Sequence, residues 1–351
     1  MAVYIMLYAC IIGLYFLFKK FNKGKLVYVI TISIILSLLV GLRHYSMGLV
    51  DTEFVYMPRF YRISDFGWKY VLEEKDFLFQ TLTYWFIQIF GDNFQLYLFL
   101  FGLPYIFSMG FIIYKYSNNP LLSFIIFVSL HYFEISFTLM RQVFGMGILL
   151  IALHYLFKKK YIKFVLLVVL SSYFHSICMI FLILLPLSFL KVRKWYVIPF
   201  VAILAMTLIL PDFVMKFTFD NLVSSDRFSR YEEIETSKSL VLFLLNLVMW
   251  GVSLLAYKDI KQNKMLTILF YCSSLAVLIS PLVLSLGEMS RVSYIFGISN
   301  VILLPYAFNY FSEDNEKILC IAITSAVFIA YFMVFLSGTV NINPYIPYFK
   351  V

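Results

Sequence analysis

Arginine and histidine recur beside long apolar runs in this sequence. Arg43, Arg141 and Arg291 each lie at one end of an apolar run that is long enough to form a helix, and His175 lies between two such runs. Arginine keeps its charge when partly desolvated and can bind phosphate or carboxylate through two parallel hydrogen bonds. Charge at the end of an apolar span is costly, so each arginine either belongs to a functional site, reaches the outer lipid headgroups or pairs with an acid. We therefore predict an anion-binding site formed by these arginines, with His175 as a base or hydrogen-bond donor.

Acidic and basic residues follow Arg43 in an aromatic, charged segment. Asp51 and Glu53 form a D-x-E pair, and Arg59 and Arg62 come shortly after it. Such a pair can hold a divalent cation, but a solvated loop would carry the same residues. The segment suits a cover over a polar site.

A second polar group precedes Arg141. Steps of three, four and three residues predict one polar helical face, formed by His131, Glu134, Thr138 and Arg141. Two pairings are open for Glu134, one with Arg141 and one with His131. Either pairing would leave Glu134 close enough to orient the site.

Charged residues also occur late in the chain. Glu288 and Arg291 are three residues apart, so they either pair or face a cavity together, and Tyr294 follows three residues later. The loop 212–238 contains Arg227 and Arg230 among acidic and aromatic residues. It could bind glycan by hydrogen bonds and stacking, or be a solvated loop.

Composition places all these residues in a membrane protein. The 351 residues are 62% hydrophobic and 13% charged, with a mean hydropathy of +0.90. Soluble domains carry about 25% charged residues, so a soluble surface is excluded. A crossing helix needs about 20 mostly apolar residues. We predict an all-α polytopic protein, one integral membrane domain over 1–351, with twelve spans at 1–18, 26–42, 94–114, 121–140, 142–157, 162–175, 176–190, 195–211, 239–257, 265–286, 290–310 and 318–338.

Lysines set the predicted orientation. They cluster after the first, fifth, seventh and ninth spans, and the positive-inside rule places these four loops in the cytoplasm. The orientation holds only if the apolar run 77–90 does not cross, so we predict a re-entrant or interfacial helix there. The main external loops are then 43–93 and 212–238.

Seven of the eight arginines fall outside in this arrangement, against the positive-inside trend. The excess points to an anionic partner on the outer side. The net charge of +9 therefore reflects topology plus these arginines, and it indicates no nucleic-acid patch.

Short motifs over most of the chain resemble the EpsG/Wzy group of bacterial polysaccharide polymerases. The matching pieces are Gly41-Leu42-Arg43, Met140-Arg141-Gln142, Phe174-His175-Ser176, and Arg291 with Tyr294. The family has Gly-Thr-Asp in its first loop, whereas this chain has Gly48-Leu49-Val50-Asp51-Thr52-Glu53.

The resemblance implies a GT-C-like membrane glycosyltransferase acting at the outer face of the bacterial plasma (inner) membrane. Such proteins join oligosaccharide repeat units carried on undecaprenyl pyrophosphate, which then leaves. Arg43, Arg141 and Arg291 would stabilise its charge by preorganised electrostatics. These arginines would remove the need for a metal, so we expect neither metal nor cofactor.

The resemblance also implies residue roles and partners. His175 is the first candidate for the base, and Asp51 and Glu288 are alternatives. Substrate binding is assigned to Gln142, Arg59, Arg62, Glu134, Arg227, Arg230 and Tyr294. The expected partners are lipid-linked oligosaccharides and membrane lipid, and whether a chain-length regulator binds is open.

Other functions have specific requirements. A flippase or transporter of lipid-linked glycans would need a cavity that also opens to the cytoplasm, where the basic loops are short. A membrane O-acyltransferase would need a cytoplasmic route for its acyl donor, whereas His175 is predicted outside. An assembly subunit would need no chemistry. We predict the polymerase.

Overall fold

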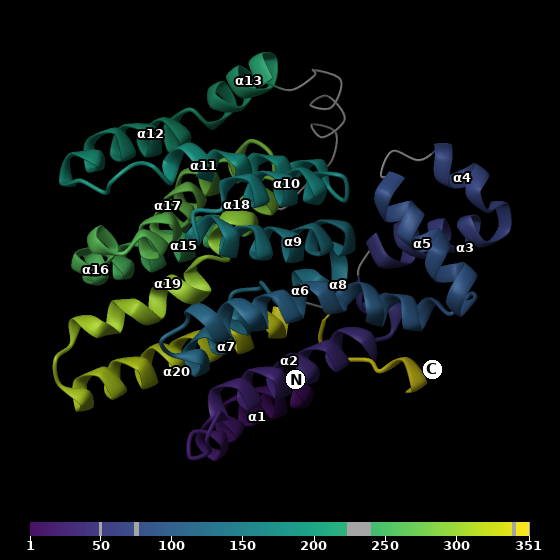
Figure 1. Ribbon diagram of the computed structural model, residues 1–351, viewed down its shortest axis with the longest axis horizontal. Helices are drawn as coiled ribbons and strands as arrows, with labels where there is room; N and C mark the ends of the chain where they lie inside the picture. The colour runs from purple at the N-terminus through teal and green to yellow at the C-terminus, as the bar shows by residue number, and fades with distance from the viewer. Residues whose placement is uncertain (49–50, 74–76, 223–239, 339–341, 351) are drawn as a thin grey trace. The chain divides into compact units, whose positions relative to one another are not determined.

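Helices joined by short turns make up the computed structural model, which describes residues 1–48, 51–73, 77–222, 240–338 and 342–350 (Figure 1). Contacts between residues divide the chain into two compact units. The sequence predicts a single membrane domain over 1–351. The first unit is Met1–Leu182 with Glu313–Val351, and the second is Ile183–Ser312. Within the described ranges, β-type backbone pairing is limited to one isolated bridge, between Arg43 and Pro347. The all-α prediction is confirmed.

The first unit contains eleven α-helices within the described residues. They are α1 (Ala2–Phe18), α2 (Gly24–Gly41), α3 (Met57–Phe66), α4 (Trp68–Glu73), α5 (Phe77–Phe90), α6 (Phe94–Tyr116), α7 (Pro120–Ser129), α8 (Ile135–Thr138), α9 (Met140–Phe157), α10 (Tyr161–Ser172) and α20 (Asp314–Gly338). A π-helical segment, Asp51–Tyr56, leads into α3, and a 3₁₀ segment, Ser176–Ile183, follows α10. Helices α3, α4 and α5 pack on one another, so the predicted external loop 43–93 is largely helical (Figure 1).

Asparagine caps fix where two of these helices begin. The side chain of Asn93 accepts a hydrogen bond from the backbone nitrogen of Leu96 (2.9 Å), at the start of α6. Asn119 accepts one from Leu122 (3.1 Å) at the start of α7, where Pro120 is the first helical residue. Both are strong N-terminal signals, because they satisfy backbone donors that have no partner within the helix.

Glycines allow α9 to approach its neighbours closely. A Cβ atom at Gly147 would lie 3.0 Å from the backbone nitrogen of Tyr105 and 3.1 Å from the carbonyl of Pro104, both in α6. A Cβ at Gly145 would lie 2.8 Å from the sulfur of Cys178, beyond α10. These contacts set the position of the N-terminal end of α9, which carries Arg141.

The second unit is built around α17. Its helices within the described part are α11 (Leu184–Leu187), α12 (Val197–Ile209), α13 (Pro211–Leu222), α15 (Val241–Ser253), α16 (Tyr257–Gln262), α17 (Lys264–Ile279), α18 (Met289–Gly297) and α19 (Asn300–Ala307). Helix α17 packs on α15, α16, α18 and α19. The buried amide of Asn246 donates to the hydroxyls of Ser280 (2.8 Å) and Ser293 (3.0 Å), so it ties α15 to the 3₁₀ segment Ser280–Leu284 and to α18.

The helices confirm a polytopic membrane protein. Fewer than twelve of the described helices, however, are long enough to cross a membrane. Six described helices are long and apolar enough to cross a membrane, or eight if two bent pairs each count as one span. The pairs bend by 101° after Ile209 and by 49° after Gly297. Five further apolar helices have 10–17 residues, below the roughly 20 that a straight crossing needs.

The predicted span 121–140 is not one helix. Helix α7 ends at Ser129, His131 adopts a left-handed backbone (φ 65°), and the short α8 follows. The four polar residues from His131 to Arg141 therefore do not form one continuous helical face, and that prediction is wrong. The break allows the ring of His131 to contact Phe335 of α20 (3.9 Å between centroids).

Candidate active site

Arg43 follows α2 and is fully buried, with 0% of its surface exposed. One Nη donates to the carbonyl of Val40, and the other donates to the carbonyl of Phe137 (3.0 Å). The guanidinium also lies 5.2 Å from the centre of the Phe137 ring. Burial lowers the pKa of Arg43 to about 10, so the group stays positive at neutral pH. The arginine ties the end of α2 to α8.

The π-helical segment Asp51–Tyr56 and Arg43 both donate hydrogen bonds to the carbonyl of Phe137. The hydroxyl of Thr52 donates to Phe137 O at 3.0 Å, next to the half-buried Asp51. The amide of Gln95 donates to the carbonyl of Arg43 at 3.0 Å, from the first turn of α6. The Arg43 motif and the acidic motif thus share one buried polar junction.

The end of the chain pairs with the residues around Arg43. His44 donates its backbone N–H to Ile346 (2.7 Å), and Tyr348 donates to Leu42 (3.0 Å). The hydroxyl of Tyr345 donates to the carbonyl of Leu39 (2.9 Å). Sequence reasoning missed this contact, because residues 342–350 carry no charged motif that marks them as part of a site.

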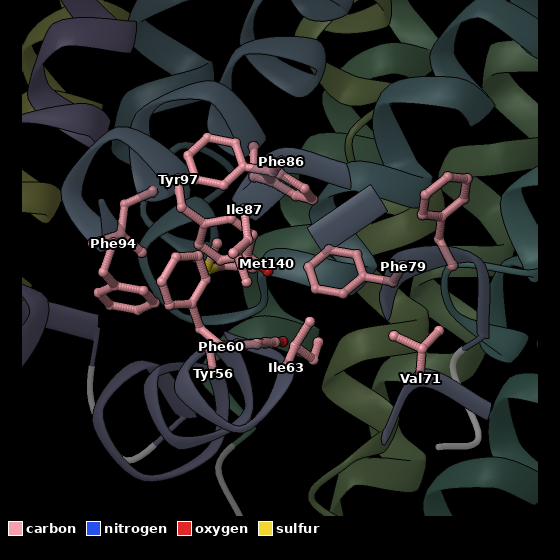
Figure 2. Packing of buried hydrophobic residues seen from close by; sticks show 13 residues of the cluster. Tyr56, Phe60, Ile63, Val71, Phe79, Phe86, Ile87, Phe94, Tyr97 and Met140 are labelled. Carbon is pink, nitrogen blue, oxygen red and sulfur yellow. The ribbon is translucent and has the colours of Figure 1, made fainter. Parts of the chain in front are cut away.

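An aromatic cluster fills the space between α3, α5, α6 and the start of α9 (Figure 2). Its rings pack closely, with centroids 5.0 Å apart for Phe60 and Tyr97 and 5.3 Å apart for Phe79 and Phe101. Large buried aromatic side chains contribute much of the packing energy of a core. The buried members are Tyr56, Phe60, Ile63, Val71, Phe79, Phe86, Ile87, Phe94, Tyr97, Leu98, Phe101, Met140 and Phe174.

Arg141 is held against this aromatic cluster. Its guanidinium carbon lies 5.8 Å from the centre of the Tyr56 ring, within the range of a cation–π contact. Its backbone N–H donates to the hydroxyl of Tyr56 at 3.4 Å. Met140 before it is buried in the cluster, whereas the Arg141 side chain is only partly buried. The cluster therefore fixes the start of α9, and the partly buried Arg141 side chain lies against the Tyr56 ring.

His175 belongs to the same region of the first unit. Phe174 stacks on Phe144 of α9, with centroids 4.6 Å apart and an interplanar angle of 27°. Phe144 is one helical turn after Arg141. The backbone N–H of His175 donates to Ser171 at 3.2 Å, which ends α10. The helix pair α9 and α10 thus brings the Arg141 and His175 motifs to one end of the bundle.

The other predicted residues of the first unit differ in exposure. Arg59 lies on α3, between Tyr56 and Phe60 in the sequence, and is partly buried, whereas Arg62 is exposed. Gln142 is buried, with its amide 3.9 Å from the sulfur of Met146. Glu134 hydrogen-bonds to His131 at 2.8 Å, which resolves its two predicted pairings in favour of His131.

Arg291 and its neighbours lie in the second unit. The Nε of Arg291 is 2.7 Å from a carboxylate oxygen of Glu288, which confirms the pairing at a spacing of three residues. Tyr294 follows on α18 and is partly buried. The proximity of Arg291 to Arg43 and Arg141 stays a prediction. Arg227 and Arg230 lie outside the described residues.

Acidic and sulfur ligands do not gather in the described part of the chain. No group of three or more His, Cys, Asp or Glu side chains there is arranged to hold a metal ion. The four cysteines are free thiols. Arg43 is held by backbone carbonyls and Arg141 by an aromatic ring, and a guanidinium fixed in this way suits an anion.

Comparison with known proteins agrees with the motifs. A model of the EpsG family matches residues 26–349, nearly the whole chain. The chain belongs to the EpsG family. This membership confirms the resemblance read from the sequence, and it is consistent with a polysaccharide polymerase of the glycosyltransferase kind. No curated protein and no solved structure matches the chain.

Proposed function

We propose that this EpsG-family chain is a polysaccharide polymerase with a GT-C-like fold. It joins oligosaccharide repeat units carried on undecaprenyl pyrophosphate at the outer face of the bacterial plasma membrane. The observation that carries the proposal is the placement of Arg141. Its guanidinium carbon lies 5.8 Å from the centre of the Tyr56 ring, on a partly buried side chain in the region of the first unit that also carries Arg59 and His175.

The reaction needs positive charge where the lipid leaves. The hydroxyl of a new lipid-linked unit attacks the anomeric carbon of the growing chain. The bond to undecaprenyl pyrophosphate breaks, and its electron pair stays on the pyrophosphate oxygen. Arg141 stabilises that developing charge, because a cation fixed beforehand by Tyr56 needs little reorganisation during the reaction. Arg291, held by Glu288, stays a predicted second contact to pyrophosphate.

A base must take the proton from the attacking hydroxyl. His175 is the proposed base, since a histidine exchanges protons near neutral pH and this one is partly exposed next to the aromatic cluster. Asp51 and Glu288 are the alternatives. Each cycle forms one glycosidic bond and releases one undecaprenyl pyrophosphate and one proton.

Arg43 suits a positioning role better than a direct contact. Both of its terminal nitrogens donate to backbone carbonyls, and none of its surface is exposed. Its junction with Thr52 holds the segment that carries Asp51, and Tyr56 ends that segment beneath Arg141. Arg43 therefore acts on the substrate through the placement of Asp51 and Tyr56.

Helix α5 offers a surface for the polyprenyl chain. One side of α5 is buried in the aromatic cluster through Phe79 and Phe86, while Trp85 and Ile89 on the other side are 55% and 68% exposed. An apolar exposed face next to a cationic site suits an amphiphile with a charged head and a long apolar tail. We assign α5 to guiding that tail.

A polymerisation assay tests the proposed function: the purified protein is placed in liposomes and supplied with lipid-linked repeat units. A polymerase produces a ladder of longer glycans, seen on gels, and releases undecaprenyl pyrophosphate in proportion to the linkages formed. A flippase changes only the sidedness of the lipid-linked unit, and an acyltransferase changes only its mass by an acyl group. Either of those outcomes without a ladder contradicts the proposal.

A further inference from the structure

A large cationic cavity lies wholly within the second unit. Its volume is about 870 Å³, and it is formed by residues 188–194 and by residues between 257 and 267. Five of the twelve lining residues are basic, and none of the twelve is acidic. The basic residues are Lys191, Arg193, Lys194, Lys261 and Lys264.

This arrangement goes beyond what membrane orientation requires. The positive-inside rule asks for basic residues in cytoplasmic loops, but it does not require loops distant in sequence to surround one space. Like charges that face a common cavity repel one another unless an anion is bound between them. The cavity therefore has the electrostatic character of an anion site.

Apolar side chains stand beside the basic residues. Phe189 and Leu190, both lining the cavity, are 62% and 46% exposed, and Trp195 is 56% exposed just after Lys194. The ammonium of Lys264 lies 5.5 Å from the centre of the Phe189 ring. A free phosphate would use the cations alone, whereas a molecule with a phosphate and acyl chains would use both features.

We propose that this cavity binds the phosphodiester headgroup of an anionic phospholipid, with the acyl chains lying on Phe189, Leu190 and Trp195. Its volume is within the range of about 300–1,000 Å³ that small-molecule sites occupy. Basic pockets between membrane helices on the cytoplasmic side bind anionic headgroups. The cavity lies beside the loops that are predicted cytoplasmic, so the lipid comes from the inner leaflet. The proposal does not depend on the polymerase reaction.

Lipid binding to the full-length protein tests the proposal. The variant Lys191→Gln/Lys194→Gln/Lys261→Gln removes three charges from the cavity. The control Lys158→Gln/Lys160→Gln/Lys163→Gln removes three exposed charges from the end of α9 and the start of α10, a stretch that is predicted cytoplasmic. Native mass spectrometry in detergent measures bound phosphatidylglycerol, with phosphatidylcholine as the neutral reference.

The cavity variant should bind phosphatidylglycerol about 100-fold more weakly, because each of the three lysines contributes about 1 kcal/mol, or about fivefold in affinity, near an anionic lipid. The control variant should match the wild type. Equal binding by all three proteins, or an equal loss in both variants, overturns the proposal. If the triple cavity variant does not fold, the single substitution Lys261→Gln, at an exposed residue, should still weaken phosphatidylglycerol binding about fivefold.

Inorganic pyrophosphate distinguishes a lipid from a soluble anion. We expect phosphatidylglycerol to stay bound in the presence of millimolar pyrophosphate, since the acyl chains contribute contacts that pyrophosphate lacks. Displacement of the lipid by pyrophosphate at that concentration would assign the cavity to a soluble anion and overturn the lipid proposal.

Discussion

Arg43 and Arg141, both in the first unit, illustrate how burial divides roles between residues of one type. Arg43 is enclosed and bonded to two carbonyls, while Arg141 rests on an aromatic ring and stays partly exposed. Both are equally conspicuous in the sequence. The difference arises from the carbonyl of Phe137, which is 94 residues from Arg43 in the chain. A contact of that separation has no local sequence signal.

Replacing Arg43 by lysine tests its positioning role. Lysine has a single ammonium and cannot span two carbonyls as the guanidinium fork does. We expect Arg43→Lys to lower the free energy of unfolding by about 1–3 kcal/mol, because a buried acceptor loses its partner. Thermal unfolding in detergent measures the change. The exposed Arg62→Lys is the control, and equal melting temperatures for both variants would show that the buried junction is not needed.

His175 is tested by kinetics. If it takes the proton from the attacking hydroxyl, His175→Ala should lower kcat by about 10²–10⁴-fold while KM changes little. Initial rates of ladder formation at several concentrations of lipid-linked unit separate the two constants. An unchanged kcat with a raised KM would assign His175 to substrate binding instead.

Among the elements, apolar runs predicted where several helices lie. The run 77–90 coincides with α5, and the run 94–114 begins where α6 begins. The break after α7 was not predictable, because the left-handed backbone of His131 has no glycine or proline to signal it. His131 is held there by contacts 200 residues away, including a 3.2 Å hydrogen bond to the hydroxyl of Tyr331.

The contact between α6 and α9 depends on Gly147. A Cβ at this position would meet the backbone of Pro104 and Tyr105 at 3.0–3.1 Å, and backbone atoms cannot rotate away as a side chain can. We expect Gly147→Ala to lower the free energy of unfolding by about 1–3 kcal/mol through overpacking. Thermal unfolding in detergent measures the loss.

Gly13→Ala in α1 provides the matched control. A Cβ there meets no atom within 4 Å, and alanine favours helix over glycine. This variant should therefore melt at or above the wild-type temperature. If both variants melt alike, close approach between α6 and α9 does not determine the stability of the first unit.

For the whole molecule, composition and lysine placement predicted a polytopic helical protein, and the structure confirms this class. The twelve spans stay a prediction, because six to eight of the described helices are long enough to cross a membrane and apolar character alone does not distinguish a crossing helix from a short apolar one. The predicted spans 121–140 and 162–175 contain the short helices α7 and α10, which have 10 and 12 residues. Family membership followed from motifs that extend over most of the chain.

The predicted orientation can be tested by labelling single cysteines. The four native cysteines are replaced by alanine, and a cysteine is placed at exposed Arg62 or exposed Lys160. In intact spheroplasts, a membrane-impermeant maleimide should label Arg62→Cys but not Lys160→Cys. After permeabilisation it should label both. Labelling of Lys160→Cys in intact spheroplasts would invert the orientation and place the Arg43 and Arg141 motifs on the cytoplasmic side.

The most direct test of the central claim is the polymerisation rate of Arg141→Ala in liposomes supplied with lipid-linked repeat units. Lys69→Ala, an exposed position in the same predicted external segment, is the control. We predict a loss of about 10²–10³-fold in kcat for Arg141→Ala, as for removal of one preorganised charge-stabilising group, and a normal rate for Lys69→Ala. Ladders formed at the wild-type rate by folded Arg141→Ala would contradict the account.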